Sequence, residues 1–212
     1  MRNVFNMDSP LMRFLSWLAD LVILNLCFLI GSLPLVTAGA SLTALYSVCL
    51  KMVRNEESGI FTGFWKAWKA NLRQSTLAWL LVLAFGTLTA VEFGIIRQMT
   101  GGMRWFFLAA WVIIAVLAGA VVWYVFPYMA RFEDRLTVCI ANAFRFSALH
   151  ILYTLASLAV LALFIAVTLW TPETFAWMLL FWLMLGFALT AYTNSVFMRK
   201  FFAPFENATG SP

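Results

Sequence analysis

Long apolar runs, separated by short polar or charged intervals, make up most of the chain. Five of them approach the ~20 residues that a helix needs to cross the hydrocarbon core of a bilayer. These five cover residues 14–33, 76–96, 105–126, 148–170 and 175–196. A sixth run at 36–53 is shorter and less apolar, so it is either a crossing or a helix on the membrane surface. The pattern predicts an all-α integral membrane protein, with residues 1–212 forming a single polytopic domain.

The basic residues favour the crossing at 36–53. Without it, Lys and Arg divide ten against four between the two sides of the membrane; with it, they divide twelve against two. Basic residues beside spans favour the cytoplasmic side. The minority then consists of Arg97 and Arg104 alone. The sequence therefore predicts six spans in three hairpins, with both termini in the cytoplasm.

Each predicted hairpin has a short turn with a residue that suits a helix end. Pro34 lies in the first turn at 32–35, because proline cannot continue the hydrogen bonding of the preceding helix. Gly101 and Gly102 supply a flexible second turn, and Pro172 lies in the third. All three turns are expected on the outer side, which leaves no sizeable outer domain.

Two amphipathic helices are predicted on the inner side, at 60–73 and 131–146. The first places aromatic and aliphatic side chains on one face and basic ones on another, as expected for a helix at the headgroup level. Its apolar face contains Phe61, Phe64, Trp65, Trp68 and Leu72, and its basic face Lys66, Lys69 and Arg73. The second helix has an apolar face of Phe132, Leu136, Ile140 and Ala143 and a polar face of Arg131, Asp134, Arg135 and Asn142.

Composition supports lipid as the solvent of the spans. Apolar residues make up 64% of the chain and charged residues only 11%, whereas a soluble domain usually carries about a quarter. The net charge of +5 lies beside the apolar runs, which suits contact with anionic headgroups and excludes a nucleic-acid partner. Cys27, Cys49 and Cys139 have no metal or disulfide spacing.

The candidate polar residues within the spans have structural and functional interpretations. Asp20 and Glu92 are costly in lipid and are therefore candidate proton or cation sites. The favoured alternative pairs Asp20 with Arg13, and Glu92 with Arg97, near the membrane surfaces.

Asn25, Asn71 and Asn194 are expected to form interhelical hydrogen bonds, and His150 to be a polar residue at the interface. Small-residue pairs at Ala90/Gly94 and Ala115/Gly119 suit close helix packing, more within the chain than between chains.

No nucleophile with a base, phosphate-binding glycine loop or metal-ligand motif is found in the sequence. We therefore predict no catalytic residue, no cofactor and no metal, and a protein that is not an enzyme.

Three segments resemble a known family. They are SLPLVTAGASLTALYSV at 32–48, FWKAWKANLRQST at 64–76 and FPYMARFEDRL at 126–136, and they resemble the YesL-like bacterial membrane proteins, a family of unknown function. The resemblance implies an accessory role beside carbohydrate ABC transporters in a bacterial cell membrane. It adds to Asp20, Asn25 and Glu92 the following candidate functional or packing residues: Pro34, Thr37, Asn71, Gln74, Pro127, Arg131 and Asn142.

Two functional hypotheses follow. The first is an accessory or assembly component that docks on an ABC permease or ATPase subunit, with the lipid bilayer as the equally weighted alternative contact. The docking candidates are Phe64, Trp65, Lys66, Trp68, Lys69 and Arg73. The second is an independent small-solute transporter or channel, against which the spans carry few polar residues and show no interruption at mid-membrane. The sequence does not fix an oligomeric state.

Overall fold

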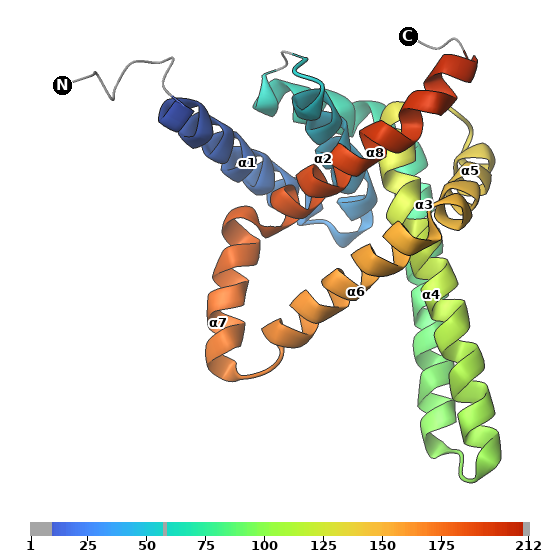
Figure 1. Cartoon of the computed structure of the whole chain (residues 1–212). Coiled ribbons are helices and arrows are strands. Elements are labelled where there is room, and N and C mark those ends of the chain that lie inside the picture. The colour runs from blue at the N-terminus through green and yellow to red at the C-terminus, as the bar shows by residue number, and fades with distance from the viewer. Residues whose placement is uncertain (1–9, 57–58, 210–212) are drawn as a thin grey trace.

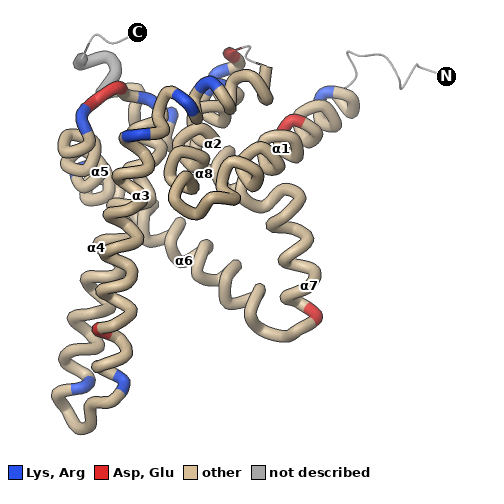
Figure 2. Tube along the Cα trace, turned by 180° about the vertical axis from the view of Figure 1, so that it is seen from behind, with Lys and Arg blue, Asp and Glu red and all other residues tan. Residues whose placement is uncertain are grey.

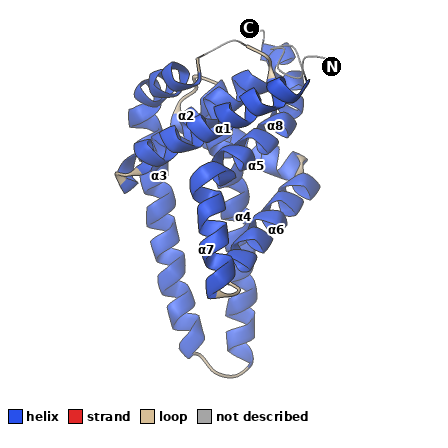
Figure 3. Ribbon diagram, turned by 90° about the vertical axis from the view of Figure 1, so that its left-hand side faces the viewer, coloured by secondary structure: helices blue, strands red, loops and turns tan. Residues whose placement is uncertain are grey.

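The computed structural model describes residues 10–56 and 59–209, with side chains as far as residue 204. Every regular element in this part is a helix (Figure 3). The helices are α1 (Pro10–Ser32), α2 (Ala38–Val53), α3 (Ile60–Gln98), α4 (Gly102–Arg131), α5 (Leu136–Leu149), α6 (Ile151–Thr168), α7 (Pro172–Phe181) and α8 (Phe187–Thr209) (Figure 1). A 3₁₀ turn, η1 (Leu35–Thr37), precedes α2, and a π-helical turn, η2 (Trp182–Gly186), joins α7 to α8.

Six helical stretches of the described chain are long and apolar enough to cross a bilayer. They are Pro10–Ser32, Leu35–Val53, Ile60–Gln98, Gly102–Arg131, Ile151–Thr168 and Pro172–Pro204. The prediction of an all-α membrane protein with six candidate spans is therefore confirmed.

Both predicted amphipathic helices have different bounds in the structure. The segment 60–73 is the beginning of the continuous helix α3, not a separate helix. Since 60–98 contains no proline and only three isolated glycines, nothing in its sequence breaks the helix. The second helix begins at Leu136 rather than at 131, because residues 132–135 form a non-helical link. Arg131 is consequently the last residue of α4.

One region, which we call the head, contains most of the buried core. It consists of α1, α2, α5, α8, residues 60–79 of α3 and residues 120–131 of α4. Leu24, Leu45, Tyr124 and Phe202 are among its fully or almost fully buried side chains. Gly39 allows α2 to approach α3 closely, because a Cβ atom there would overlap the Ser75 carbonyl oxygen. The head is thus packed like a small helical domain.

Two helical hairpins, which we call legs, extend from the head (Figures 1 and 3). The α3–α4 leg comprises residues 80–119, and the α6–α7 leg comprises α6 and α7. The Trp111 indole Nε1 donates to the Thr89 carbonyl oxygen at 2.9 Å, which joins the two helices of the first leg. Most other side chains of the legs are exposed and apolar, such as Leu88 at 64%. Such surfaces are stable in lipid and not in water.

The first hairpin turn does not reach the level of the turn between α3 and α4. The Trp79 indole Nε1 donates to the Leu35 carbonyl oxygen at 2.8 Å, so the turn between α1 and α2 lies halfway along α3. Helix α3 continues for 19 residues from Trp79 to Gln98, or about 28 Å at 1.5 Å per residue. The α3–α4 leg therefore extends past the first turn by nearly the thickness of a hydrocarbon core.

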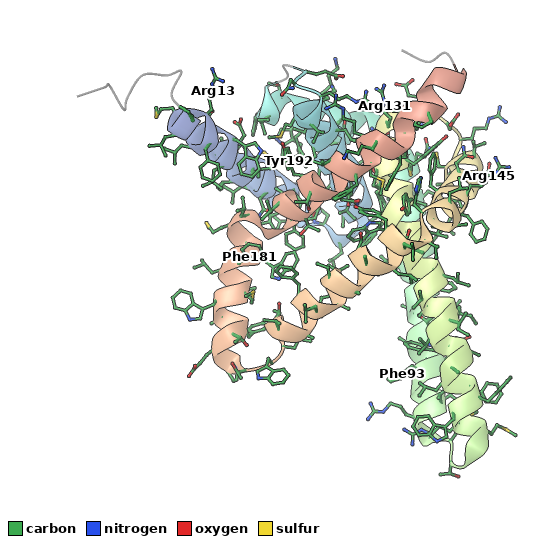
Figure 4. All side chains as sticks on the ribbon, in the orientation of Figure 1. Arg13, Phe93, Arg131, Arg145, Phe181 and Tyr192 are labelled. Atoms are coloured by element: carbon green, nitrogen blue, oxygen red, sulfur yellow. The ribbon has the colours of Figure 1, made fainter. Side chains whose placement is uncertain are left out.

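Basic residues gather on the head, as Figure 2 shows, and a separate group lies at the end of the α3–α4 leg. The latter is Arg97 in the last turn of α3 together with Arg104 in the first turn of α4. Figure 4 places Arg13, Arg131 and Arg145 on the head and Phe93 far along the leg. We call the end of the head that carries these charges the basic side, and the turn at 99–101 the far turn.

Candidate functional site

Asn25 on α1 occupies a buried position against the π-helical turn η2. Its side chain is 0% exposed. The Nδ2 atom donates to the carbonyl oxygens of Trp182 and Leu183, at 3.1 and 2.8 Å, and Oδ1 accepts from the Ala188 backbone N–H at 3.0 Å. A π turn disturbs the regular backbone bonding of a helix, and in lipid each unpaired group is costly. One amide thus satisfies three backbone groups, and the expected interhelical bonding of Asn25 is found.

The last candidate span is interrupted at this point. Helices α7 and α8 run in clearly different directions on either side of η2 (Figure 1). Gly186 is packed on this turn, because a Cβ atom there would lie 2.6 Å from the Trp182 ring. The expectation of uninterrupted spans is therefore wrong for this segment, whose sequence contains no proline at the break. Such turns are frequent at functional sites of helical proteins.

A cavity of about 470 Å³ adjoins η2, between α4, α6 and α8. Buried polar groups form one side of it. The Tyr153 hydroxyl donates to Asn194 Oδ1 at 2.8 Å, and Asn194 Nδ2 donates to the Tyr46 hydroxyl at 3.0 Å. This chain of bonds joins α6, α8 and α2. Asn194 therefore makes the interhelical bonds expected of it.

A second polar network lies where α3, α4 and α5 meet. The Tyr128 hydroxyl donates to Asp134 Oδ2 at 2.7 Å, and Asn142 Nδ2 donates to the same hydroxyl at 2.7 Å. Gln74 Nε2 donates to the Asp134 carbonyl oxygen at 2.6 Å, which ties α3 to the link between α4 and α5. Burial, reinforced by the nearby Asp134 charge, raises the pKa of the Cys139 thiol to about 11. The network fixes the link and leaves the thiol protonated.

The structure brings some of the candidates from the family resemblance together. Gln74 and Asn142 belong to the α3–α4–α5 network, and Pro127 precedes its Tyr128 within α4. Thr37 instead holds the first turn, with its hydroxyl donating to the Gly31 carbonyl oxygen at 2.9 Å. Pro34 is exposed in that turn.

Asn71 lies apart from these networks. Its Nδ2 atom donates to the Ala67 carbonyl oxygen of the same helix at 3.0 Å, so the expected interhelical bond is not the one formed.

The predicted ion pairs of Asp20 and Glu92 are absent. Neither Asp20 with Arg13 nor Glu92 with Arg97 forms a salt bridge, although all four residues are described. Glu92 is exposed on the α3–α4 leg. Asp20 lines an open hollow of about 690 Å³ on the head, together with Arg13, Trp17, Glu56 and Tyr192, of which Figure 4 labels Arg13 and Tyr192.

The residues predicted to dock on lipid or a partner divide into two groups. Phe64 is 0% exposed in the core of the head, and Trp68 Nε1 donates to the Ser41 hydroxyl at 3.2 Å. Phe64 is therefore corrected to a core residue, because the aromatic face of this segment packs on α1 and α2. The basic residues Lys66, Lys69 and Arg73 are exposed.

His150 stacks on Phe201 with ring centroids 3.8 Å apart, and burial lowers the pKa of His150.

The sequence did not identify three tyrosines of the two networks as candidate residues. Tyr46, Tyr128 and Tyr153 each bond an asparagine on another helix. A tyrosine in an apolar run is hard to distinguish from an interfacial anchor. The sequence indicated only that each buried asparagine needs a hydrogen-bond partner on another helix.

The fold and the buried polar networks define a multi-pass α-helical membrane protein. Residues 21–93, from α1 to near the end of α3, match the family model described as "Protein of unknown function, DUF624". No curated protein matches the chain. No solved structure matches it either.

Proposed function

We propose that the protein is an accessory or assembly component of ABC-type carbohydrate uptake in a bacterial plasma membrane, with its termini and basic side in the cytoplasm. The observation that carries the proposal is the pair of legs, which expose apolar helix faces over about a bilayer's thickness beyond the packed head. Such faces suit contacts with helices of another membrane protein. The role is one of binding, not of catalysis, and it needs no cofactor.

Glycines on the α3–α4 leg support docking between chains. A Cβ atom at Gly86 or at Gly94 would meet nothing within 4 Å, so neither glycine serves packing within the chain. Small residues in lipid-facing helices allow another helix to approach closely. The Ala90/Gly94 pair, expected to serve packing within the chain, is accordingly assigned in this proposal to a partner helix.

The carbohydrate part of the proposal rests on the YesL-like segments, two of which lie largely within the matched residues 21–93. A permease would meet the α3–α4 leg within the bilayer, whereas an ATPase would meet the exposed Lys66, Lys69 and Arg73 on the basic side. The positive charge on that side supports the cytoplasmic orientation.

Affinity purification from the native host in mild detergent tests this function. We expect the wild type to retain ABC permease or ATPase subunits and the Gly94→Leu variant to lose most of them, because leucine blocks close helix approach. Gly102→Leu is the matched control, since that glycine is equally open but lies at the far turn. Absence of any transporter subunit from the wild-type eluate would contradict the proposal.

A second candidate, a small-solute transporter, is favoured by the interruption at η2. Transporters often bind substrate where a span is broken. Flux of a labelled solute into proteoliposomes that contain this protein alone would support this candidate. Tight vesicles across a panel of sugars and amino acids would contradict it.

A further inference from the structure

The cavity beside η2 has a mostly apolar lining, which is unusual for a site that a polar molecule would pass through. Aromatic and aliphatic side chains cover most of it, and none of its lining residues is charged. The apolar wall includes Phe164, Phe181, Trp182 and Phe197. Its volume of about 470 Å³ lies within the range of ordinary small-molecule sites.

One hydrogen-bond donor in the wall of this cavity is buried without an acceptor in good hydrogen-bond geometry. The Trp123 indole Nε1 is buried and lies beside the Tyr153 hydroxyl, but not in the geometry of a hydrogen bond. The neighbouring polar groups are already engaged: Tyr153 with Asn194, and the Thr190 hydroxyl with the Gly186 carbonyl oxygen at 2.8 Å. Buried donors without partners are uncommon in proteins. The cavity therefore offers one N–H to an occupant.

The cavity lies at a depth reached by lipid chains. Phe126 packs on Trp79 with ring centroids 6.2 Å apart, and Trp123 precedes Phe126 by about one helical turn toward the far turn. Trp79 also marks the level of the first hairpin turn. Helices α6 and α7 next to the cavity expose apolar residues such as Leu163 and Leu180, at 62 and 50%. In a bilayer, these exposed faces would place acyl chains beside the cavity.

We infer that this cavity binds the acyl ester of a membrane lipid, with the ester carbonyl oxygen accepting a hydrogen bond from Trp123 Nε1 and the chain lying along Phe164, Phe181 and Phe197. A sugar does not suit the site, because it needs many free polar partners. A phosphate or metal ion does not suit it either, because the lining carries no charge. The inference is independent of the proposed function.

Photocrosslinking of the purified full chain in nanodiscs tests the inference. The probe is a monoacylglycerol with a diazirine in its acyl chain, and the labelled peptides are identified by mass spectrometry. We expect labelling of α6 and α8 at the cavity that saturates and is displaced by unlabelled monooleoylglycerol. Even labelling of all lipid-facing helices, without saturation, would overturn the inference.

Two tryptophan variants separate the hydrogen bond from general effects. Trp123→Phe keeps an aromatic ring but removes the N–H. It should raise the probe concentration needed for half-saturation about fivefold, as expected for one lost hydrogen bond. Trp111→Phe is the matched control, because its indole bonds Thr89 within the α3–α4 leg, and it should bind like the wild type. Equal binding by both variants would overturn the assigned role of Trp123.

Two further measurements complete the test. Ser157→Phe places a ring in the cavity and should abolish saturable labelling even if Trp123→Phe does not fold; unchanged labelling would count against the site. A phosphatidylcholine probe with the same acyl diazirine distinguishes the sources. Equal labelling identifies phospholipid as the occupant, and weaker labelling identifies a neutral acylglycerol; both results support an acyl-ester site.

Discussion

At the scale of single residues, polar side chains are few and each has a defined task. Asn25 satisfies backbone groups of η2, Gln74 fixes the link between α4 and α5, and Asn194 joins two tyrosines. These amides act within a mostly apolar interior, where an unpaired polar group costs more than a single bond contributes. Their removal should therefore be felt strongly.

Replacing Asn25 with leucine tests this directly. The change keeps the volume but leaves the Trp182 and Leu183 carbonyl oxygens and the Ala188 N–H without their partner, so we expect a loss of about 2 kcal/mol or more. Thermal unfolding in detergent should show a lower Tm. Asn71→Leu is the control, because Asn71 bonds only its own helix. Equal Tm values for the two variants would contradict the role of Asn25.

The raised pKa of Cys139 predicts that its thiol reacts slowly with maleimide. With a pKa of about 11, only about one thiol in a thousand is ionised at pH 8, and the thiolate is the reactive form. Maleimide modification of Cys139 should accelerate about tenfold per pH unit between pH 7 and 10. A cysteine introduced by Glu133→Cys, in the exposed link, should react much faster at pH 7. Similar rates at the two positions would show that Cys139 is not held as described.

At the scale of helices, close packing of α2 on α3 positions the first hairpin. The contact depends on Gly39, which lies against the Ser75 carbonyl oxygen and the Trp79 side chain. The Thr43 and Ser75 hydroxyls bond each other at 2.8 Å one turn further along α2. Together these contacts hold the first turn halfway along α3.

Gly39→Ala should therefore destabilise the head by about 1–3 kcal/mol, because the added methyl group forces α2 away from α3. Gly86→Ala provides the opposite case, since its surroundings are open and alanine favours a helix. The midpoints of thermal unfolding should fall for the first variant and be unchanged or raised for the second. A Gly39→Ala protein as stable as the wild type would refute the close approach.

Hydropathy predicted the helices well because membrane helices must contain their own backbone bonds and therefore show long apolar runs. It could not predict the level of the first turn, which depends on the Leu35–Trp79 contact between distant segments. It also missed η2, because the π turn is stabilised by Asn25 from the other end of the chain and not by a local breaker. The burial of Phe64 was missed for the same reason: an amphipathic face does not reveal what covers it.

At the scale of the whole molecule, a packed head carries most of the basic residues and two apolar legs extend from it (Figure 2). From Arg73 to Arg97, helix α3 rises about 36 Å at 1.5 Å per residue, which suits a bilayer core and its borders. The first hairpin turn then lies near the basic side and not at the far surface.

Cysteine accessibility in intact cells tests this arrangement most directly. Single cysteines are introduced at Gly101 in the far turn, Leu33 in the first turn and Asn55 on the basic side, and a membrane-impermeant maleimide is added outside. The predicted result is labelling of the Gly101→Cys variant alone, with the Asn55→Cys variant labelled only after permeabilisation. Labelling of the Asn55→Cys variant from outside, or of Leu33→Cys as fast as Gly101→Cys, would contradict the placement of the legs in lipid and the head at the basic side.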